Sequence, residues 1–244
     1  MKKVRLDQLV FERGLAPSRE RAKTSIMAGL VFVDGQRCDK AGTSVPEDAA
    51  IEVRGDDCPY VSRGGLKLEE GIRASGFNLT GQRILDIGAS TGGFTHCALL
   101  HGAREVVALD VGHSQLHDSL RHDPRVTVIE NTNIRHLEPQ ALAPVDGIVI
   151  DVSFISLTKA LPPALPFLKE NGWFICLIKP QFEAERHEIG KGGVIRDDQL
   201  RLAILERTIS SLHALGLDIL GHTVSPIQGQ KKGNIEYLAW GNKG

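Results

Sequence analysis

The feature that most constrains the fold is the alternation of strand-like and helix-like segments between residues 80 and 244. Seven short segments rich in Val, Ile and Leu are predicted strands, from "RILDIG" at 83–88 to "IEYLAW" at 235–240. Helix-like stretches separate most of them, and the clearest is "DDQLRLAILERTISSLHAL" at 197–215. Apolar strands that alternate with helices form a parallel sheet with helices on both faces.

The end of the chain departs from this alternation. The last two predicted strands are separated only by "PIQGQKKGN" at 226–234, which is short enough for an antiparallel hairpin at the sheet edge. Most dinucleotide-binding folds continue with another crossover, whereas an antiparallel last strand is typical of methyltransferases. We therefore predict an α/β, Rossmann-like S-adenosylmethionine-dependent methyltransferase fold with a seven-stranded sheet.

The N-terminal segment follows a different pattern and predicts a small α+β domain over 1–60, with 61–79 as linker and first catalytic-domain helix before the sheet domain, 80–244. Leu6, Leu9 and Val10 share a helix face, and Ser18 can cap a second helix. Residues 1–23 hold seven Lys or Arg against three acids. A solvated face explains such a cluster, and so does a helix that contacts phosphates.

Composition excludes several classes of protein. A formal net charge of -1 argues against a uniformly basic coat for nucleic acid. The sequence has neither an apolar run of about 18 residues nor a signal-peptide pattern, so we expect no membrane contact and a cytoplasmic location. The four cysteines show no metal-ligand spacing and are expected to be free thiols, two of them in the core. His113 and His117 lack a carboxylate signature and are interpreted as helix-surface residues, so no metal site is expected.

A glycine-rich loop, "ILDIGASTGGFT", follows the first strand of the sheet, where doubly wound folds bind their ligands. It lacks the Gly-Lys-Ser/Thr ending of a P-loop and has Ser90 in place of the middle glycine of a nicotinamide fingerprint. Asp86 would repel a pyrophosphate but suits an ammonium group, and Asp110 ends the next strand, where an acid can accept both ribose hydroxyls. These features indicate S-adenosylmethionine. The predicted cofactor-binding residues are Asp86, Gly88, Ser90, Thr91, Gly92, Gly93, Phe94, Asp110, Asn131, Asn133 and Asp151, the two asparagines as readers of the adenine edge.

The chemical type of the methyl acceptor is predicted by elimination, because the motifs typical of two acceptor types are absent from the strand ends. An amino group on a base would call for Asn/Asp-Pro-Pro-aromatic after the fourth strand, but the sequence there is "DVSF", 151–154. A base carbon would call for a cysteine nucleophile, and Cys176 lies inside a strand without a Pro-Cys context. Transfer from a sulfonium needs no metal, only alignment and removal of a proton. A hydroxyl acceptor remains.

Two resemblances name a family. "RLDQLVFERGLAPSRERAKTSIMAGLVFVDGQR" resembles the S4 RNA-binding domain, and the set Lys67, Asp151, Lys179 and Glu236 resembles the catalytic tetrad of FtsJ-like ribose 2′-O-methyltransferases. Together with "YVSRGGLKL", "IKPQFE" and "KGGVIRD", they make the chain similar to the TlyA (haemolysin A) family. The resemblance implies 2′-O-methylation of cytidine in ribosomal RNA, with ribosomal RNA or subunits as partners. The predicted RNA-binding residues are Arg5, Arg19, Arg21, Lys23 and Arg63.

The tetrad suggests roles for its lysines. Lys179 ends an apolar strand, and a desolvated lysine beside a second cation loses its proton more readily, so we expect it to be the base and Lys67 to stay charged. A lysine that extends to solvent is the structural alternative. Other readings are a non-catalytic RNA-binding or ribosome-assembly protein and a membrane-active haemolysin. The sequence leaves open the nucleotide, the ribosomal subunit, the oligomeric state and the domain orientation.

Overall fold

The computed structural model describes residues 3–16, 18–27, 29–53, 58–190, 192–228 and 234–243. The chain divides into two compact units, Met1–Asp57 and Cys58–Gly244. Each unit has its own hydrophobic core. Within the described ranges, no helix has both the length and the apolar character needed to cross a bilayer.

The described part of the first unit contains two helices and five short strands. In chain order they are β1 (Lys3–Arg5), α1 (Leu6–Glu12), α2 (Arg19–Met27), β2 (Val31–Val33), β3 (Gln36–Cys38), β4 (Ser44–Pro46) and β5 (Ile51–Val53). The α1 face of Leu6, Leu9 and Val10 is buried in the core of the unit, as predicted. The small α+β domain expected from the sequence is therefore present.

Local signals in the first unit act as the sequence indicates. Ser18 accepts a hydrogen bond from the backbone N–H of Arg21, so its side chain caps the start of α2. The strands β2 and β3 form an antiparallel hairpin around Asp34 and Gly35. Both turn residues have positive φ, 48° and 77°, which is the conformation that an Asp-Gly pair favours in a two-residue hairpin loop.

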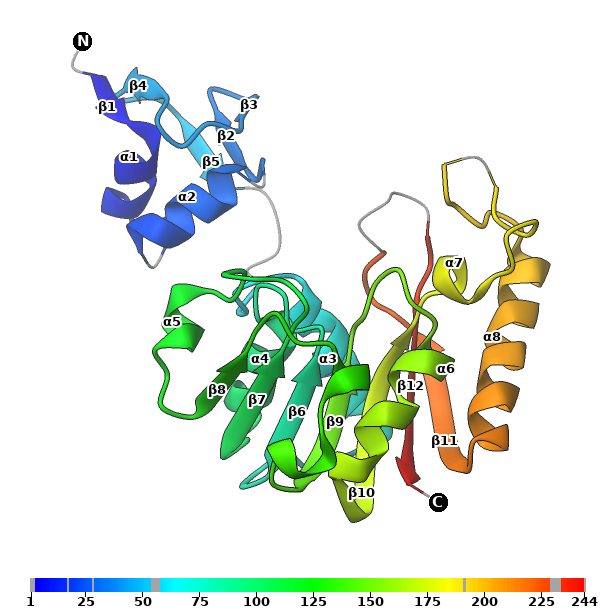
Figure 1. The fold of residues 1–244 in the computed structure, drawn as a ribbon. Coiled ribbons are helices and arrows are strands. Elements are labelled where there is room, and N and C mark those ends of the chain that lie inside the picture. Colours follow the sequence, from blue (N-terminus) through cyan, green and yellow to red (C-terminus); the bar gives the residue numbers. More distant parts are fainter. Residues whose placement is uncertain are drawn as a thin grey trace. The chain divides into compact units, whose positions relative to one another are not determined.

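Seven strands of the second unit form one sheet: β6 (Arg83–Ile87), β7 (Glu105–Leu109), β8 (Val126–Ile129), β9 (Val145–Ile150), β10 (Leu168–Ile178), β11 (Leu217–Val224) and β12 (Tyr237–Lys243). Their order across the sheet is β11-β12-β10-β9-β6-β7-β8 (Figure 1). The strands from β10 to β8 are parallel, and β12 is antiparallel to both of its neighbours. The predicted seven-stranded sheet with an antiparallel last strand is confirmed.

The last strand lies inside the sheet, between β10 and β11, and β11 is the edge strand. The hairpin predicted at the edge is thus present, although most of its connecting loop, 226–234, lies outside the described residues. In the β10–β12 pair, Ile178 is opposite Tyr237. The next positions in this register are Lys179 and Glu236, so the pairing brings two residues of the predicted tetrad to the same edge.

Helices cover both faces of the sheet. They are α3 (Gly64–Ser75), α4 (Gly93–Leu100), α5 (Asp118–Arg121), η1 (Ile134–His136), η2 (Pro139–Ala141), α6 (Leu157–Ala160), η3 (Pro162–Phe167), α7 (Pro180–Glu183) and α8 (Asp198–Ala214). One core cluster joins α3 and α4 to the sheet, and the other joins α6, η3 and α8 to its opposite face. Neighbouring strand residues such as Ile148 and Val149 belong to different clusters, which explains why the strands are apolar throughout.

Backbone strain gathers at the carboxyl edge of this sheet. The loops that follow β6, β7, β8 and β9 each contain a non-glycine residue with positive φ: Ser90 (48°), Ser114 (54°), Asn131 (53°) and Phe154 (65°). Left-handed backbone is costly for residues with a side chain and persists where surrounding contacts impose it, often at functional sites. Four of the five non-glycine residues with positive φ in the described part of this unit thus lie at the edge at which parallel folds bind ligands; the fifth, Asn171, lies within β10.

Candidate active site

Four charged residues that the sequence singles out are brought together at the carboxyl edge. Asp151 directly follows β9, Lys179 directly follows β10, and Glu236 directly precedes β12. Lys67 reaches the same place from the first turns of α3. Lys67, Lys179 and Glu236 are buried, with 7%, 7% and 3% of their surface exposed. Buried charges of this kind are found almost only when they are paired.

The distances define how the tetrad is connected. Lys67 Nζ donates a hydrogen bond to Glu236 Oε2 at 2.6 Å and lies 3.7 Å from Asp151 Oδ2. Lys179 Nζ lies 2.5 Å from Asp151 Oδ1 and forms an ion pair with it. Asp151 is therefore shared by both lysines, whereas Glu236 serves Lys67.

Lys179 has further neighbours that sequence reasoning did not assign. Its Nζ donates a hydrogen bond to Ser153 Oγ at 3.1 Å and lies 5.9 Å from the centre of the Phe182 ring. The Phe182 ring in turn lies 5.2 Å, centre to centre, from that of Phe154. Phe154 is 87% exposed, so an aromatic face is open to solvent in the loop that begins with Asp151.

Asp86 lies under the glycine-rich loop, with none of its surface exposed. Thr95 Oγ1 donates to Asp86 Oδ2 at 2.6 Å, while Oδ1 has no hydrogen-bond partner among the described residues. Burial, partly offset by the Thr95 hydrogen bond, raises the pKa of this carboxyl to about 7. A buried carboxyl oxygen without a donor is costly, so this position fits a donor or a cation supplied by a ligand.

Asp110 joins two loops of the predicted cofactor site. Its Oδ2 accepts from the backbone N–H of Ser90 at 2.8 Å, and its Oδ1 accepts from that of Gly112 at 2.7 Å. Each carboxylate oxygen can accept more than one hydrogen bond, so Asp110 keeps the capacity to accept ribose hydroxyls. Asn131 lies beside this loop, with its backbone N–H bonded to the carbonyl of Gly112. Asn133 instead caps η1 by accepting from the backbone N–H of Arg135, which is the ordinary turn role of such a residue.

The glycines of the loop make room for other parts of the protein. A Cβ at Gly93 would lie 2.4 Å from Ser62 Oγ and 2.8 Å from the backbone nitrogen of Gly65. A Cβ at Gly88 would lie 2.5 Å from the carbonyl oxygen of Asp151, and the φ of Gly88 is 84°. These two glycines let the starts of α3 and α4, and the ends of β6 and β9, approach each other closely. Their approach to a ligand stays a prediction.

The remaining predicted cofactor residues differ in exposure. Ser90 and Thr91 are exposed, whereas Gly92 is buried under α5 and Phe94 packs in the core between α3 and α4.

The interpretation of His113 and His117 as helix-surface residues was wrong, because both lie in the loop before α5, where His117 is the N-cap.

Two of the predicted RNA-binding arginines of the first unit form ion pairs with one acid, Asp7. Arg5 Nε lies 3.0 Å from Asp7 Oδ1, and Arg19 Nε lies 3.2 Å from Asp7 Oδ2. Asp7 is fully buried, and its hydrogen bonds with these guanidinium groups lower its pKa to about 2. Both arginine side chains are about half exposed. Lys23, one helical turn after Arg19, is exposed on the same face of α2.

The other two predicted RNA contacts lie elsewhere. Arg21 is two residues from Arg19 and therefore projects from a different side of α2. Arg63 is exposed at the start of α3, in the second unit. RNA contact by any of these five residues stays a prediction.

Several site residues were missed by sequence reasoning. Ser153, Phe154, Phe182 and Thr95 surround predicted positions but were not assigned. A usable signal existed for Ser153 and Phe154, because both belong to the "DVSF" segment that follows the fourth sheet strand. No comparable signal marked Thr95, whose contact with Asp86 depends on how α4 packs against β6.

Family models match both units. The model of the FtsJ-like methyltransferase matches residues 60–243, and that of the S4 domain matches residues 4–51. Hemolysin A from Brachyspira hyodysenteriae is 46% identical over 238 residues, which cover 97% of this chain and 98% of the relative. The 16S/23S rRNA (cytidine-2'-O)-methyltransferase TlyA from Mycobacterium tuberculosis is 42% identical over 241 residues, covering 98% of this chain and 90% of the relative.

Solved structures agree with this assignment. A provisionally named hemolysin from Streptococcus thermophilus superposes with a TM-score of 0.78 at 41% identity, covering 100% of this chain and 89% of the other. The N-methyltransferase NodS from Bradyrhizobium japonicum, solved with S-adenosyl-L-homocysteine, gives a TM-score of 0.52 at 16% identity over 78% of this chain and 93% of the other, which shows the fold alone. Because the methyltransferase model spans most of the chain and two relatives exceed 40% identity over nearly all of it, the chain belongs to the TlyA (haemolysin A) family of FtsJ-like methyltransferases with an N-terminal S4 domain.

Proposed function

We propose that this protein transfers a methyl group from S-adenosylmethionine to the 2′-hydroxyl of a cytidine in ribosomal RNA. The observation that carries the proposal is the buried cluster of two lysines and two carboxylates at the carboxyl edge of the sheet. The printed name of the Mycobacterium relative, a cytidine-2'-O-methyltransferase, supports the same reaction. Ribosomal RNA or ribosomal subunits are then the partners, and the cytoplasm is the place of action.

The residues at the strand ends fit the cofactor. When bound, S-adenosylmethionine supplies a methyl group on a positively charged sulfonium. Asp110 would accept the ribose hydroxyls, and Asn131 would read the adenine edge. The unpartnered Oδ1 of Asp86 supports a role toward the ammonium of the methionine part. The backbone of Gly88, Ser90 and Thr91 would lie against the ligand.

The contacts of the two lysines give them different roles. Lys67 has two carboxylates, Glu236 at 2.6 Å and Asp151 at 3.7 Å, which stabilise its charge. Lys179 has one carboxylate, which it shares, and the neutral hydroxyl of Ser153. Because Lys179 shares its one carboxylate and also contacts a neutral hydroxyl, we assign it as the base that draws the proton from the 2′-hydroxyl. Lys67 stays charged and stabilises the developing negative charge on the oxygen.

The target nucleotide needs a surface to bind close to the catalytic base, Lys179. Phe154 offers an exposed aromatic ring in the loop between Asp151 and α6. RNA-modifying proteins commonly stack an unstacked base on such a ring, with a stabilisation of about 1–3 kcal/mol. Phe154 would therefore support the nucleotide whose ribose faces Lys179.

The test of the reaction compares two lysine variants. Lys179→Ala should reduce methyl transfer from labelled S-adenosylmethionine to ribosomal RNA by about 10²–10⁴-fold and leave cofactor binding within a few-fold. Lys159→Ala, at an exposed position on α6, is the matched control and should keep wild-type activity. Mapping of 2′-O-methyl groups in ribosomal RNA from cells with and without the protein identifies the nucleotide. Full turnover by Lys179→Ala would refute the assigned role of the tetrad.

RNA binding by the first unit is tested by salt dependence. Replacing Arg19 and Lys23 by Gln should weaken binding and lower the slope of log K against log salt by about 0.7–0.9 for each lost phosphate contact. An unchanged slope would assign these cations to a solvated face.

A further inference from the structure

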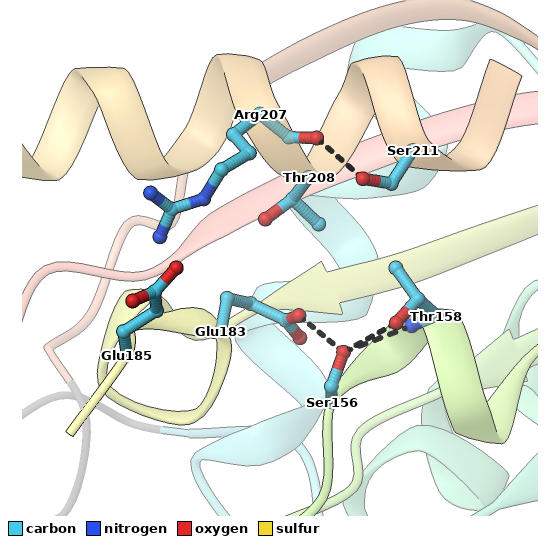
Figure 2. A pocket seen from close by; sticks show the side chains of 7 residues that line it. All are labelled: Ser156, Thr158, Glu183, Glu185, Arg207, Thr208 and Ser211. Atoms are coloured by element: carbon cyan, nitrogen blue, oxygen red, sulfur yellow. Dashed lines mark hydrogen bonds between the residues drawn. The ribbon is translucent and has the colours of Figure 1, made fainter. Parts of the chain in front are cut away.

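A cluster of polar side chains has no assigned role in the proposed reaction, although two of its members are close in sequence to residues of the tetrad. It lines a pocket of about 190 Å³ between α6, α7 and α8, formed by Ser156, Thr158, Glu183, Glu185, Arg207, Thr208 and Ser211 (Figure 2). Glu183 ends α7, four residues after Lys179, and Ser156 is the N-cap of α6, five residues after Asp151. Figure 2 shows the Glu183 carboxylate directed at Ser156.

Glu183 uses both of its oxygens on the start of α6. Oε1 accepts from the backbone N–H of Leu157 at 2.7 Å, and Oε2 accepts from Ser156 Oγ at 2.6 Å. We call these two hydrogen bonds the Glu183 clamp. Burial raises the pKa of Glu183, and no cation among the described residues forms an ion pair with it, since Arg207 in the same pocket pairs with Glu188.

Glu183 is half-buried, so its carboxylate loses part of its hydration without gaining a countercharge. An apolar side chain of similar size would pack there without the cost of desolvation. What the carboxylate provides instead is direction, because its two acceptors fix a backbone N–H and a hydroxyl at the same time. The question is which part of the molecule needs this fixed position.

The clamp holds the far end of the loop 151–157. The near end is fixed by the sheet, because the backbone N–H of Asp151 donates to the carbonyl of Ile87 at 3.0 Å. Between the two ends lie Ser153, which accepts from Lys179, and Phe154, whose φ of 65° is strained for an aromatic residue. A strained conformation persists only where its ends are held.

The clamp also ties this loop to the segment that bears the lysine. The backbone N–H of Phe182 donates to the carbonyl of Lys179 at 2.8 Å, and that of Ala184 to the carbonyl of Pro180 at 2.9 Å, so α7 continues rigidly from Lys179. Glu183 is therefore connected on one side to the base and on the other to the loop that carries Phe154.

We propose that Glu183 is a positioning residue: its clamp on Ser156 and Leu157 sets the loop 151–157, and with it Phe154, against Lys179 for the incoming nucleotide. This inference rests on the proposed function. Loss of the clamp loosens residues 153–156, whereas Leu157 stays packed in the core and Asp151 stays fixed by the sheet. Glu183 should thus affect the turnover of RNA and not the binding of S-adenosylmethionine.

The experiment compares Glu183→Ala, Glu183→Gln and Glu185→Gln in the full-length protein. Glu183→Ala should lower kcat/KM for ribosomal RNA by about tenfold or more, because misplacement by about 1 Å is enough for such losses, while the Kd for S-adenosylmethionine stays within about twofold. Glu183→Gln keeps an acceptor for Leu157 and should recover activity to within about threefold of wild type. Glu185→Gln is the matched control, because Glu185 lines the same pocket but is exposed, and its hydrogen bond and ion pair among the described residues are with Glu188 and His187; it should behave as wild type.

Two further measurements separate positioning from stability. Rates are expressed per folded molecule, counted by the stoichiometry of S-adenosylmethionine binding; an unchanged kcat/KM for Glu183→Ala on this scale would overturn the proposal. Adding Ser156→Ala to Glu183→Ala should cause little additional loss, since both changes break the same clamp, and additive losses would contradict it.

Hydrogen exchange tests the clamp without any methyl transfer. The amide of Leu157 should exchange faster in Glu183→Ala than in Glu185→Gln, and equal rates would overturn the proposal. Failure of the wild type to methylate any ribosomal RNA would refute the proposed function instead, and exchange at Leu157 would then decide whether the clamp exists.

Discussion

The affinity for S-adenosylmethionine is expected to rise about 15-fold between pH 5.5 and 7.0, because the carboxyl group of Asp86 ionises in this range. Asp86 is completely buried, has one oxygen without a partner, and has its pKa raised to about 7 by burial. The neutral acid offers little to an ammonium group, whereas the carboxylate attracts it. We therefore expect binding of S-adenosylmethionine to be linked to loss of a proton from Asp86.

The magnitude follows from the fraction of Asp86 that is ionised. With a pKa of about 7, this fraction is about 3% at pH 5.5 and about 50% at pH 7.0, and the apparent affinity is reduced by the fraction that is competent to bind. The range stops at about pH 7 because an α-amino group begins to lose its own proton near pH 7.7. The stability of the unliganded protein changes with pH in the opposite direction. Between about pH 4 and pH 7, Asp86 is ionised in the unfolded chain but still protonated in the folded one, so the free energy of unfolding falls as the pH rises through this range.

Isothermal titration calorimetry at constant ionic strength gives both the affinity and, from buffers of different ionisation enthalpy, the protons released. The control ligand is 5′-methylthioadenosine, which keeps the adenosine part but has no ammonium group, and its affinity should be independent of pH in this range. Asp86→Asn should bind S-adenosylmethionine weakly and without pH dependence. Equal affinity for S-adenosylmethionine at pH 5.5 and 7.0, or the same pH dependence for both ligands, would refute the assignment of Asp86 to the ammonium group.

Three other predictions use the same chain of reasoning. Asp7→Asn should destabilise the first unit by about 2 kcal/mol at pH 7 and remove the loss of stability expected between about pH 4 and pH 2, measured by thermal unfolding at each pH. Phe154→Gly should stabilise the protein by about 1 kcal/mol, since glycine tolerates positive φ, and yet slow RNA methylation. A rise in both stability and methylation rate would contradict a role of Phe154 in contacting the nucleobase. Gly93→Ala should cost about 1–3 kcal/mol, because its Cβ would meet Ser62 and backbone, whereas Gly64→Ala, with no contact under 3.4 Å, should cost less in the same denaturant titration.

The sheet, and the proximity of Asp151 to Lys179, could be predicted because both depend on short-range patterns. Apolar runs between helix signals define parallel strands, and a polar residue after such a strand must lie at its carboxyl edge. That reasoning brings Asp151 and Lys179 together without coordinates, and the structure confirms the predicted sheet. The pairing of Glu236 with Lys67 could not be predicted from local patterns alone. It depends on β12 lying between β10 and β11, and a hairpin pattern does not show which of its two strands lies inside the sheet.

What the sequence could not predict are contacts between segments that no pattern connects. The glycine loop is the clearest case: its spacing indicates tight turns, but only the packed structure shows that Gly93 lies against Ser62 and that Asp86 is closed off from solvent. Glu183 is a second case, because a carboxylate in a four-residue helix carries no periodic signal of burial. In both cases, the polar group and its partner are brought together by the packing of helices against the sheet. A residue proposed to position a catalytic group, such as Glu183, is therefore harder to predict from sequence than the proposed catalytic residues, which directly follow the strand ends.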